Sequence, residues 1–176
     1  PRPIEWPTSS LAAMIDMFFR DHFNIIYIDI EKDLQIFQEQ IKKINGQEKF
    51  IVFGTTFHHF SLIQNLKNNA IDQSFFKKLK IGIIDTGGTK GRTQAFTLNE
   101  SINILKDFYG SENFSFYSEY GMCELSSQAW SLKNIHDGTF QCNETLQSFC
   151  LDLNTLYSCD NLQTGFLSFK ACCHSS

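Results

Sequence analysis

Apolar positions along the first part of the chain change between helical and strand-like spacing. Apolar residues three and four positions apart follow Ser9 and Ser10, which predicts a capped helix over residues 10–22. A β-branched run at residues 25–30 predicts a strand. Helical spacing returns over residues 34–44 and ends at Asn45-Gly46, a typical helix stop. The order is therefore helix, strand, helix.

The same alternation continues for another seventy residues. Strands are predicted at residues 50–54, 79–84 and 114–118, and helices at residues 60–70 and 98–108. The last helix opens with Thr97 and Glu100, the pair of a capping box. After Trp130 the pattern weakens, and residues 150–153 and 166–169 are the best candidate strands. Alternating strands and helices imply right-handed crossovers and a mainly parallel sheet.

The predicted fold class is α/β, with a mainly parallel sheet and helices on both faces. We expect an α/β subdomain over residues 1–140 and a short β-rich continuation over residues 141–176. Ligands in such sheets bind outside the carboxyl ends of the strands. Two unusual loops fall there, after the strands at 79–84 and 114–118.

Composition narrows the function classes. The chain has 176 residues with 15 Lys and Arg against 19 Asp and Glu, a net charge of -4, which disfavours nucleic acid as a partner. No apolar run approaches the roughly 20 residues of a membrane span. Five of the six cysteines follow residue 140, unlike a disulfide-stapled scaffold, so we expect reduced thiols and a cytoplasmic protein.

The first loop, Gly87-Gly88-Thr89-Lys90-Gly91-Arg92, is rich in glycine and basic side chains. Glycine lets backbone amides approach an anion or a flat ring, but the spacing fits neither a Walker loop nor the G-x-G-x-x-G fingerprint. A tight turn that needs positive φ explains the glycines equally well. Lys90 and Arg92 either neutralise phosphate or face solvent.

The second loop, Tyr120-Gly121-Met122-Cys123-Glu124, brings together an aromatic ring, a glycine and a carboxylate. The ring can stack on a base, and Glu124 can hold Mg²⁺ beside phosphates. The alternative is a tyrosine packed in the core and a glutamate in the first turn of a helix. His58 and His59 lie at the same sheet edge, where one of them borders a pocket or both serve the helix start.

Both loops resemble motifs of the adenylate-forming enzymes. Residues 120–124 look like the Tyr-Gly-x-Thr-Glu motif, and Thr86-Gly87-Gly88-Thr89 looks like the glycine segment on the adenine side. Together with the opening residues 6–11, the segment 85–91 most resembles the acyl-protein synthetases of the LuxE type. The resemblance extends from about Trp6 to Lys170 and is weakest after Gln141.

The resemblance implies an ATP-dependent ligase that activates a fatty or other carboxylic acid as an acyl adenylate and passes the acyl group to a thiol. Gly87, Gly88 and Thr89 would line the adenine, Tyr120 would stack on it, and Glu124 would help hold Mg²⁺. Gly121, Met122 and Cys123 complete the nucleotide-binding set, with Cys123 at a position where the family has Thr. An acyl reductase is a possible partner, and no catalytic residue is assigned.

The chain also departs from the family. The Ser/Thr/Gly-rich phosphate loop, the ribose-binding Asp region and the Lys-bearing lid have no counterpart in these residues. We therefore expect a central segment that alone binds nucleotide weakly and turns over little or not at all. Two alternatives stay open: a noncatalytic remnant that acts as an interaction module, and an unrelated nucleotide-binding α/β protein whose ligand would sit at the turn after Ile30.

Overall fold

The computed structural model describes residues 9–44, 49–87, 96–110, 112, 114–121, 128–131, 139–142, 144, 146–159 and 166–171. Contacts divide the chain into two units. One comprises Pro1–Asn45 and Ser61–Ile71, and the other comprises Gly46–Phe60 and Asp72–Ser176. The predicted boundary at residues 140 and 141 is a different division, and it stays a prediction.

The first unit contains α1 (Ser10–Phe19), α2 (Leu34–Lys42) and most of α3 (Thr56–Asn68). The hydroxyl of Ser9 caps α1 by accepting a hydrogen bond from the amide of Ala12 at 3.2 Å. The strand predicted at residues 25–30 is wrong, because this segment forms no ladder with any described strand. An apolar run alone does not make a strand, since a strand also needs a hydrogen-bonding neighbour.

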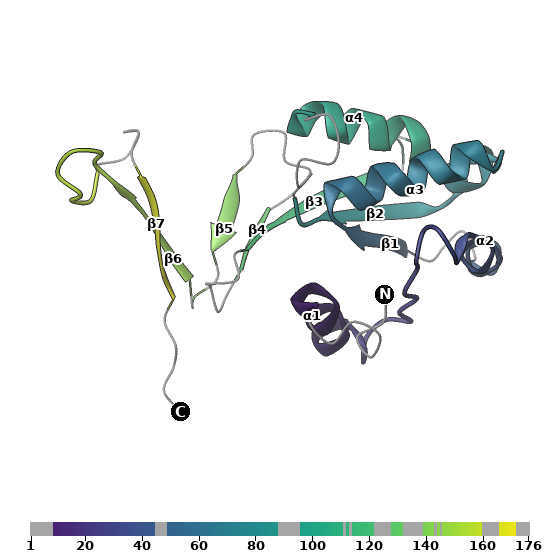
Figure 1. Ribbon diagram of the computed structural model, residues 1–176, viewed down its shortest axis with the longest axis horizontal. Helices are drawn as coiled ribbons and strands as arrows, with labels where there is room; N and C mark the ends of the chain where they lie inside the picture. Colours follow the sequence, from purple (N-terminus) through teal and green to yellow (C-terminus); the bar gives the residue numbers. More distant parts are fainter. Residues whose placement is uncertain are drawn as a thin grey trace. The chain divides into compact units, whose positions relative to one another are not determined.

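The second unit is built on a five-stranded sheet (Figure 1). Its parallel part contains β1 (Lys49–Gly54), β2 (Lys80–Asp85) and β3 (Phe114–Tyr120), with β2 in the middle. The short strands β4 (Ala129–Ser131) and β5 (Phe140–Cys142) extend the sheet in antiparallel fashion beside β3. The predicted α/β class with a largely parallel sheet is thus confirmed.

The helix α4 (Leu98–Tyr109) connects β2 to β3 and packs against β3 and a 3₁₀ helix, η1 (Gln73–Lys78). Both halves of the predicted capping box form, since the Glu100 amide donates to the Thr97 hydroxyl and the Thr97 amide donates to the Glu100 carboxylate. The ring of Phe76 on η1 meets the rings of Phe108 and Tyr109 at the end of α4, and the three rings pack edge-on or tilted. This aromatic cluster, with the inward side chains of β2 and β3, forms the core.

The carboxyl-terminal part forms a separate two-stranded antiparallel sheet of β6 (Leu146–Leu151) and β7 (Phe166–Ala171). The strand predicted at residues 166–169 is present within β7. Of the strand predicted at residues 150–153, only Cys150 and Leu151 lie in β6, and the turn that follows occupies residues 153–155. Within the described ranges, none of the helices is both long and apolar enough to cross a bilayer.

Candidate functional site

The three parallel strands end at one edge of the sheet. Gly54 on β1 is in register with Asp85 on β2, and Asp85 is in register with Ser118 on β3. The loops that follow β2 and β3 therefore start side by side, as sequence reasoning predicted for the carboxyl ends of parallel strands. Gly87 follows the end of β2 by two residues, and Tyr120 is the last residue of β3.

A buried carboxylate organises the end of β2. Asp85 is 6% exposed, and its two oxygens each lie 3.0 Å from the Thr56 hydroxyl at the start of α3. One oxygen also accepts a hydrogen bond from the Gly87 amide at 3.1 Å. Burial raises the pKa of Asp85, whereas the hydrogen bonds from Thr56 and Gly87 act to lower it. The carboxylate thus ties the start of the glycine loop to the first turn of α3.

His59 supports the same strand end from within the core. The ring is 2% exposed, and its Nε2 lies 3.1 Å from the carbonyl oxygen of Ile84. A carbonyl only accepts, so Nε2 carries the proton and the ring donates. Burial lowers the pKa of His59 to about 4, although its bonds to backbone groups of Ile84 and Gly54 act against this shift. His59 therefore supports the fold as a neutral donor, and the hypothesis of a helix-start role suits it better than a pocket role.

The end of β3 is held differently. The Ser118 amide donates to the Ser131 hydroxyl on β4 at 2.8 Å. The half-buried ring of Tyr120 lies against Phe140 of β5, with ring centroids 5.8 Å apart and planes tilted by 56°. Glu119 is 9% exposed, and burial raises the pKa of its carboxyl. A Cβ at Gly121 would meet the carboxylate of Glu119, so any other residue there would require the Glu119 side chain to move.

The structure describes three of the eight predicted nucleotide-binding residues, namely Gly87, Tyr120 and Gly121. Gly87 has a φ of +70°, the left-handed region that glycine favours, and an added Cβ would meet no described atom within 4 Å. The remaining five predicted residues lie outside the described ranges: Gly88, Thr89, Met122, Cys123 and Glu124. Lys90 and Arg92 lie outside them too.

Sequence reasoning missed the residues that position these loops. Thr56 gave no signal except its place just after a strand, and the role of Asp85 as the anchor of the glycine turn was not foreseen. The described part of the chain holds no group of three or more metal-ligating side chains. The oxygens of Asp85 already accept hydrogen bonds, and the predicted Mg²⁺ ligand, Glu124, lies outside the described residues.

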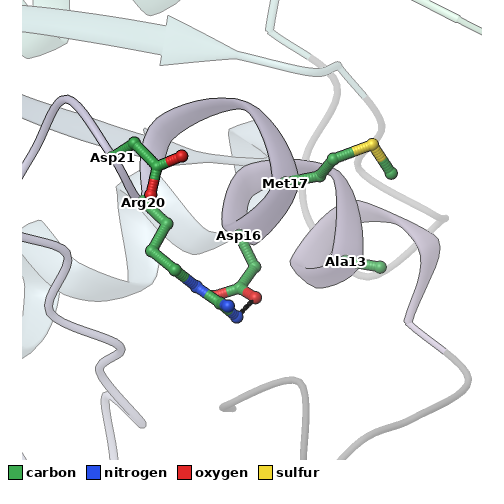
Figure 2. A pocket seen from close by; sticks show the side chains of 5 residues that line it. All are labelled: Ala13, Asp16, Met17, Arg20 and Asp21. Atoms are coloured by element: carbon green, nitrogen blue, oxygen red, sulfur yellow. Dashed lines mark hydrogen bonds and ion pairs between the residues drawn. The ribbon is translucent and has the colours of Figure 1, made fainter.

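Two surface hollows are lined by residues of the first unit. The one in Figure 2 has a volume of about 270 Å³ and is lined by five residues of α1 and the turn after it: Ala13, Asp16, Met17, Arg20 and Asp21. In it, Arg20 and Asp16 form an ion pair, and Asp16 also accepts a hydrogen bond from the Tyr27 hydroxyl at 3.3 Å. The second hollow, of about 600 Å³, is lined mainly by polar side chains of residues 30–38 and 65–69. Neither contains a predicted site residue.

Comparison with known proteins assigns this chain to no family. No protein-family model matches the chain, and no curated protein matches its sequence. Among solved structures, the ATP-bound RpMatB-BxBclM chimera B3 aligns with a TM-score of 0.46 and 14% sequence identity. The alignment covers 82% of this chain and 25% of the chimera's chain. A similarity of this size assigns neither a family nor an activity, so the resemblance to acyl-protein synthetases stays a prediction.

Proposed function

We propose that this chain is the adenine-side segment of an ATP-dependent, adenylate-forming ligase of the acyl-protein synthetase type. Its substrate would be a fatty or other carboxylic acid, activated as an acyl adenylate and then transferred to a thiol. Mg²⁺ would accompany the ATP, and a cytoplasmic acyl reductase is the kind of partner expected to consume the product. The isolated chain would bind nucleotide weakly and turn over little.

One observation carries the proposal: the two motif loops leave adjacent parallel strands at the same edge. The register of Asp85 with Ser118 brings the Gly87 turn beside the end of β3, where Tyr120 lies. Two motifs that are about 35 residues apart in sequence thus start at neighbouring positions. Ligands of open α/β sheets bind at such an edge.

The described residues are suited to a flat aromatic ligand. Gly87 leaves open space where a side chain would project, and Tyr120 at the end of β3 is half-buried. We assign Gly87 the role of a close backbone contact to adenine and Tyr120 the role of a stacking partner. Gly88, Thr89, Gly121, Met122 and Cys123 would complete the pocket, and Glu124 would hold the Mg²⁺ bound to the phosphates.

The chemical role of this part of the chain is to bind and position the nucleotide. ATP supplies the electrophilic phosphorus when it is bound, and the acid supplies the nucleophilic carboxylate. Asp85 and Thr56 fix the backbone at Gly87, where the glycine loop begins, before ligand arrives. Preorganisation of this kind lowers the entropy loss on binding.

The two alternatives make different predictions. An interaction module without catalytic function predicts no nucleotide at the strand ends. An unrelated nucleotide-binding protein predicts the ligand at the turn after Ile30, but no described strand leads into that turn. Mapping where MgATP binds therefore separates all three.

The test is a titration of the isotope-labelled chain with MgATP to millimolar concentration, followed by amide NMR shifts. We expect shifts at Gly87, Tyr120 and Gly121 and weaker shifts with MgGTP. Tyr120→Ala should weaken binding about tenfold, because stacking on an aromatic ring contributes roughly 1–3 kcal/mol per base. Tyr120→Phe should bind as the parent does.

Tyr117→Ala is the matched control, since Tyr117 lies on β3 with its side chain on the opposite face from Tyr120. Absence of shifts at the two strand ends, in a chain that is folded, would contradict the nucleotide part of the proposal. Robust ATP–pyrophosphate exchange with a fatty acid would instead show that the chain is complete as an enzyme, contrary to the expectation of a weakly active segment.

A further inference from the structure

Two cysteines face each other across the turn that follows β6. Leu151 forms an antiparallel bridge with Ser158, so the residues just outside this pair, Cys150 and Cys159, are directly opposite. The Cys159 amide donates to the Cys150 carbonyl at 2.7 Å, which shows that the ladder reaches this position. Both residues are partly exposed, and both are thiols rather than halves of a disulfide.

The geometry of such a pair is compatible with a disulfide. Directly opposite residues of an antiparallel ladder have their side chains on the same face of the sheet. Their Cα atoms lie about 5.5 Å apart in a hydrogen-bonded pair. Disulfides usually join Cα atoms roughly 4.4–6.8 Å apart, a range that includes the usual separation of opposite residues in an antiparallel ladder.

The turn between the two cysteines is built to hold them together. One oxygen of the Asp152 carboxylate accepts hydrogen bonds from the amides of Asn154 and Thr155, at 2.9 and 2.8 Å, and from the Thr155 hydroxyl. The Asp152 amide in turn donates to the Tyr157 carbonyl at 2.8 Å. These bonds direct residues 157–159 back along β6. The effective concentration of one thiol at the other is therefore high.

We propose that Cys150 and Cys159 form an oxidation site whose oxidant is a low-molecular-weight disulfide such as oxidised glutathione. One cysteine, as its thiolate, attacks a sulfur of the oxidant, forms a mixed disulfide and releases one glutathione thiolate. The second cysteine, as its thiolate, attacks the protein sulfur of the mixed disulfide and releases the second glutathione. The protein pair is oxidised by two electrons, one glutathione disulfide is reduced to two thiols, and the two cysteine protons pass to the departing thiolates. This site is independent of the function proposed above.

The test is peptide mapping of the full chain after equilibration in glutathione buffers of increasing oxidised fraction. Cleavage before aspartates and after glutamates separates the two cysteines into the peptides 145–151 and 152–159. We expect these two peptides, joined by a disulfide, to be the main oxidised product. Cys150→Ser should leave Cys159 as a mixed disulfide with glutathione, because the resolving thiol is gone.

Two variants check the role of the turn. Asp152→Ala removes the acceptor that organises the turn, so it should need a several-fold more oxidising buffer for half-conversion. Asn154→Ala keeps the amide that donates to Asp152 and should leave the midpoint unchanged. The proposal is wrong if Cys150 joins mainly another cysteine, or if both thiols stay reduced or singly glutathionylated where other cysteines of the chain have reacted.

Discussion

The ends of β2 and β3 lie side by side, yet their buried carboxyl groups are held in different ways. At the end of β2, Asp85 accepts hydrogen bonds from the Thr56 hydroxyl and the Gly87 amide. At the end of β3, burial alone accounts for the raised pKa of Glu119. The comparison teaches that burial raises the pKa of both carboxyl groups, but hydrogen bonds offset part of this shift at Asp85, whereas none contributes at Glu119.

The largest effect is expected at His59, which anchors β2 from the core. His59→Ala leaves a cavity and removes the donor to the Ile84 carbonyl, so unfolding should require about 3 kcal/mol less free energy at neutral pH. His22→Ala, at an exposed histidine, is the control and should change stability little. Urea unfolding of both variants and the parent measures the difference. A loss no larger than that of the control would show that His59 does not anchor β2.

The same variant should also remove a pH dependence. Since the pKa of His59 is lowered from 6.5 to about 4 in the folded state, the unfolded chain binds more protons between these values. The stability from His59 is therefore complete above pH 6.5 and is lost as pH falls through about 4. The difference between parent and His59→Ala should shrink over this range. A difference that stays constant would contradict a buried neutral ring.

The next effect is expected at the Asp85 anchor. Thr56→Val keeps the shape of the side chain but removes the hydroxyl that donates to the buried carboxylate, so we expect a loss of about 2 kcal/mol. Thr55→Val is the comparison one residue away: it removes a hydroxyl that hydrogen-bonds the exposed His58 ring and accepts from the His58 amide, and we expect a smaller loss. Denaturant unfolding measures both losses of free energy. Equal losses from the two substitutions would mean that the hydrogen bond from Thr56 to Asp85 adds no stability beyond that of an ordinary threonine hydroxyl.

Local patterns predicted most of the elements. The capping box at Thr97 and the apolar runs of β2 and β3 depend on residues that are close together in the chain. The sequence alone is therefore sufficient to predict these elements. The strand prediction at residues 25–30 failed because strand pairing depends on a partner elsewhere in the chain, which a local apolar pattern does not reveal. β4 and β5, with three residues each, are too short to carry a periodic signal.

The candidate site likewise has features that the sequence predicted and features that it did not. Strand order placed the two loops at one edge. The alternative explanation of the glycines, a tight turn that needs positive φ, fits Gly87. The contact between Thr56 and Asp85 joins residues 29 positions apart, and only the register of β1 and β2 brings them together. Sequence spacing therefore identified the loops but not the side chains that fix them.

A smaller effect is expected where the glycine loop begins. Gly87→Ala forces a residue with a Cβ into φ +70° without any described steric contact, so we expect a loss of about 1 kcal/mol from backbone strain. Gly87→Asn should lose less, because asparagine tolerates the left-handed region better. Thermal unfolding of the two variants tests this. Equal stability of Gly87→Ala and the parent would mean that the turn adopts another conformation in solution.

The smallest effect, with the opposite sign of pH dependence, is expected at Glu119. Its pKa is raised above 4.5, so the folded state binds more protons than the unfolded state, and the stability gained from Glu119 is complete below 4.5 and lost as pH rises through the folded pKa. Glu119→Gln removes the charge and should stabilise the protein by up to about 1 kcal/mol at neutral pH, with the gain fading toward pH 4.5. Glu100→Ala, which removes the side chain that accepts from the Thr97 amide, breaks the capping box and should destabilise at neutral pH instead. Denaturant unfolding across this pH range separates the two. A destabilising Glu119→Gln would show that the carboxylate at the end of β3 is satisfied after all, and the contrast with Asp85 would then disappear.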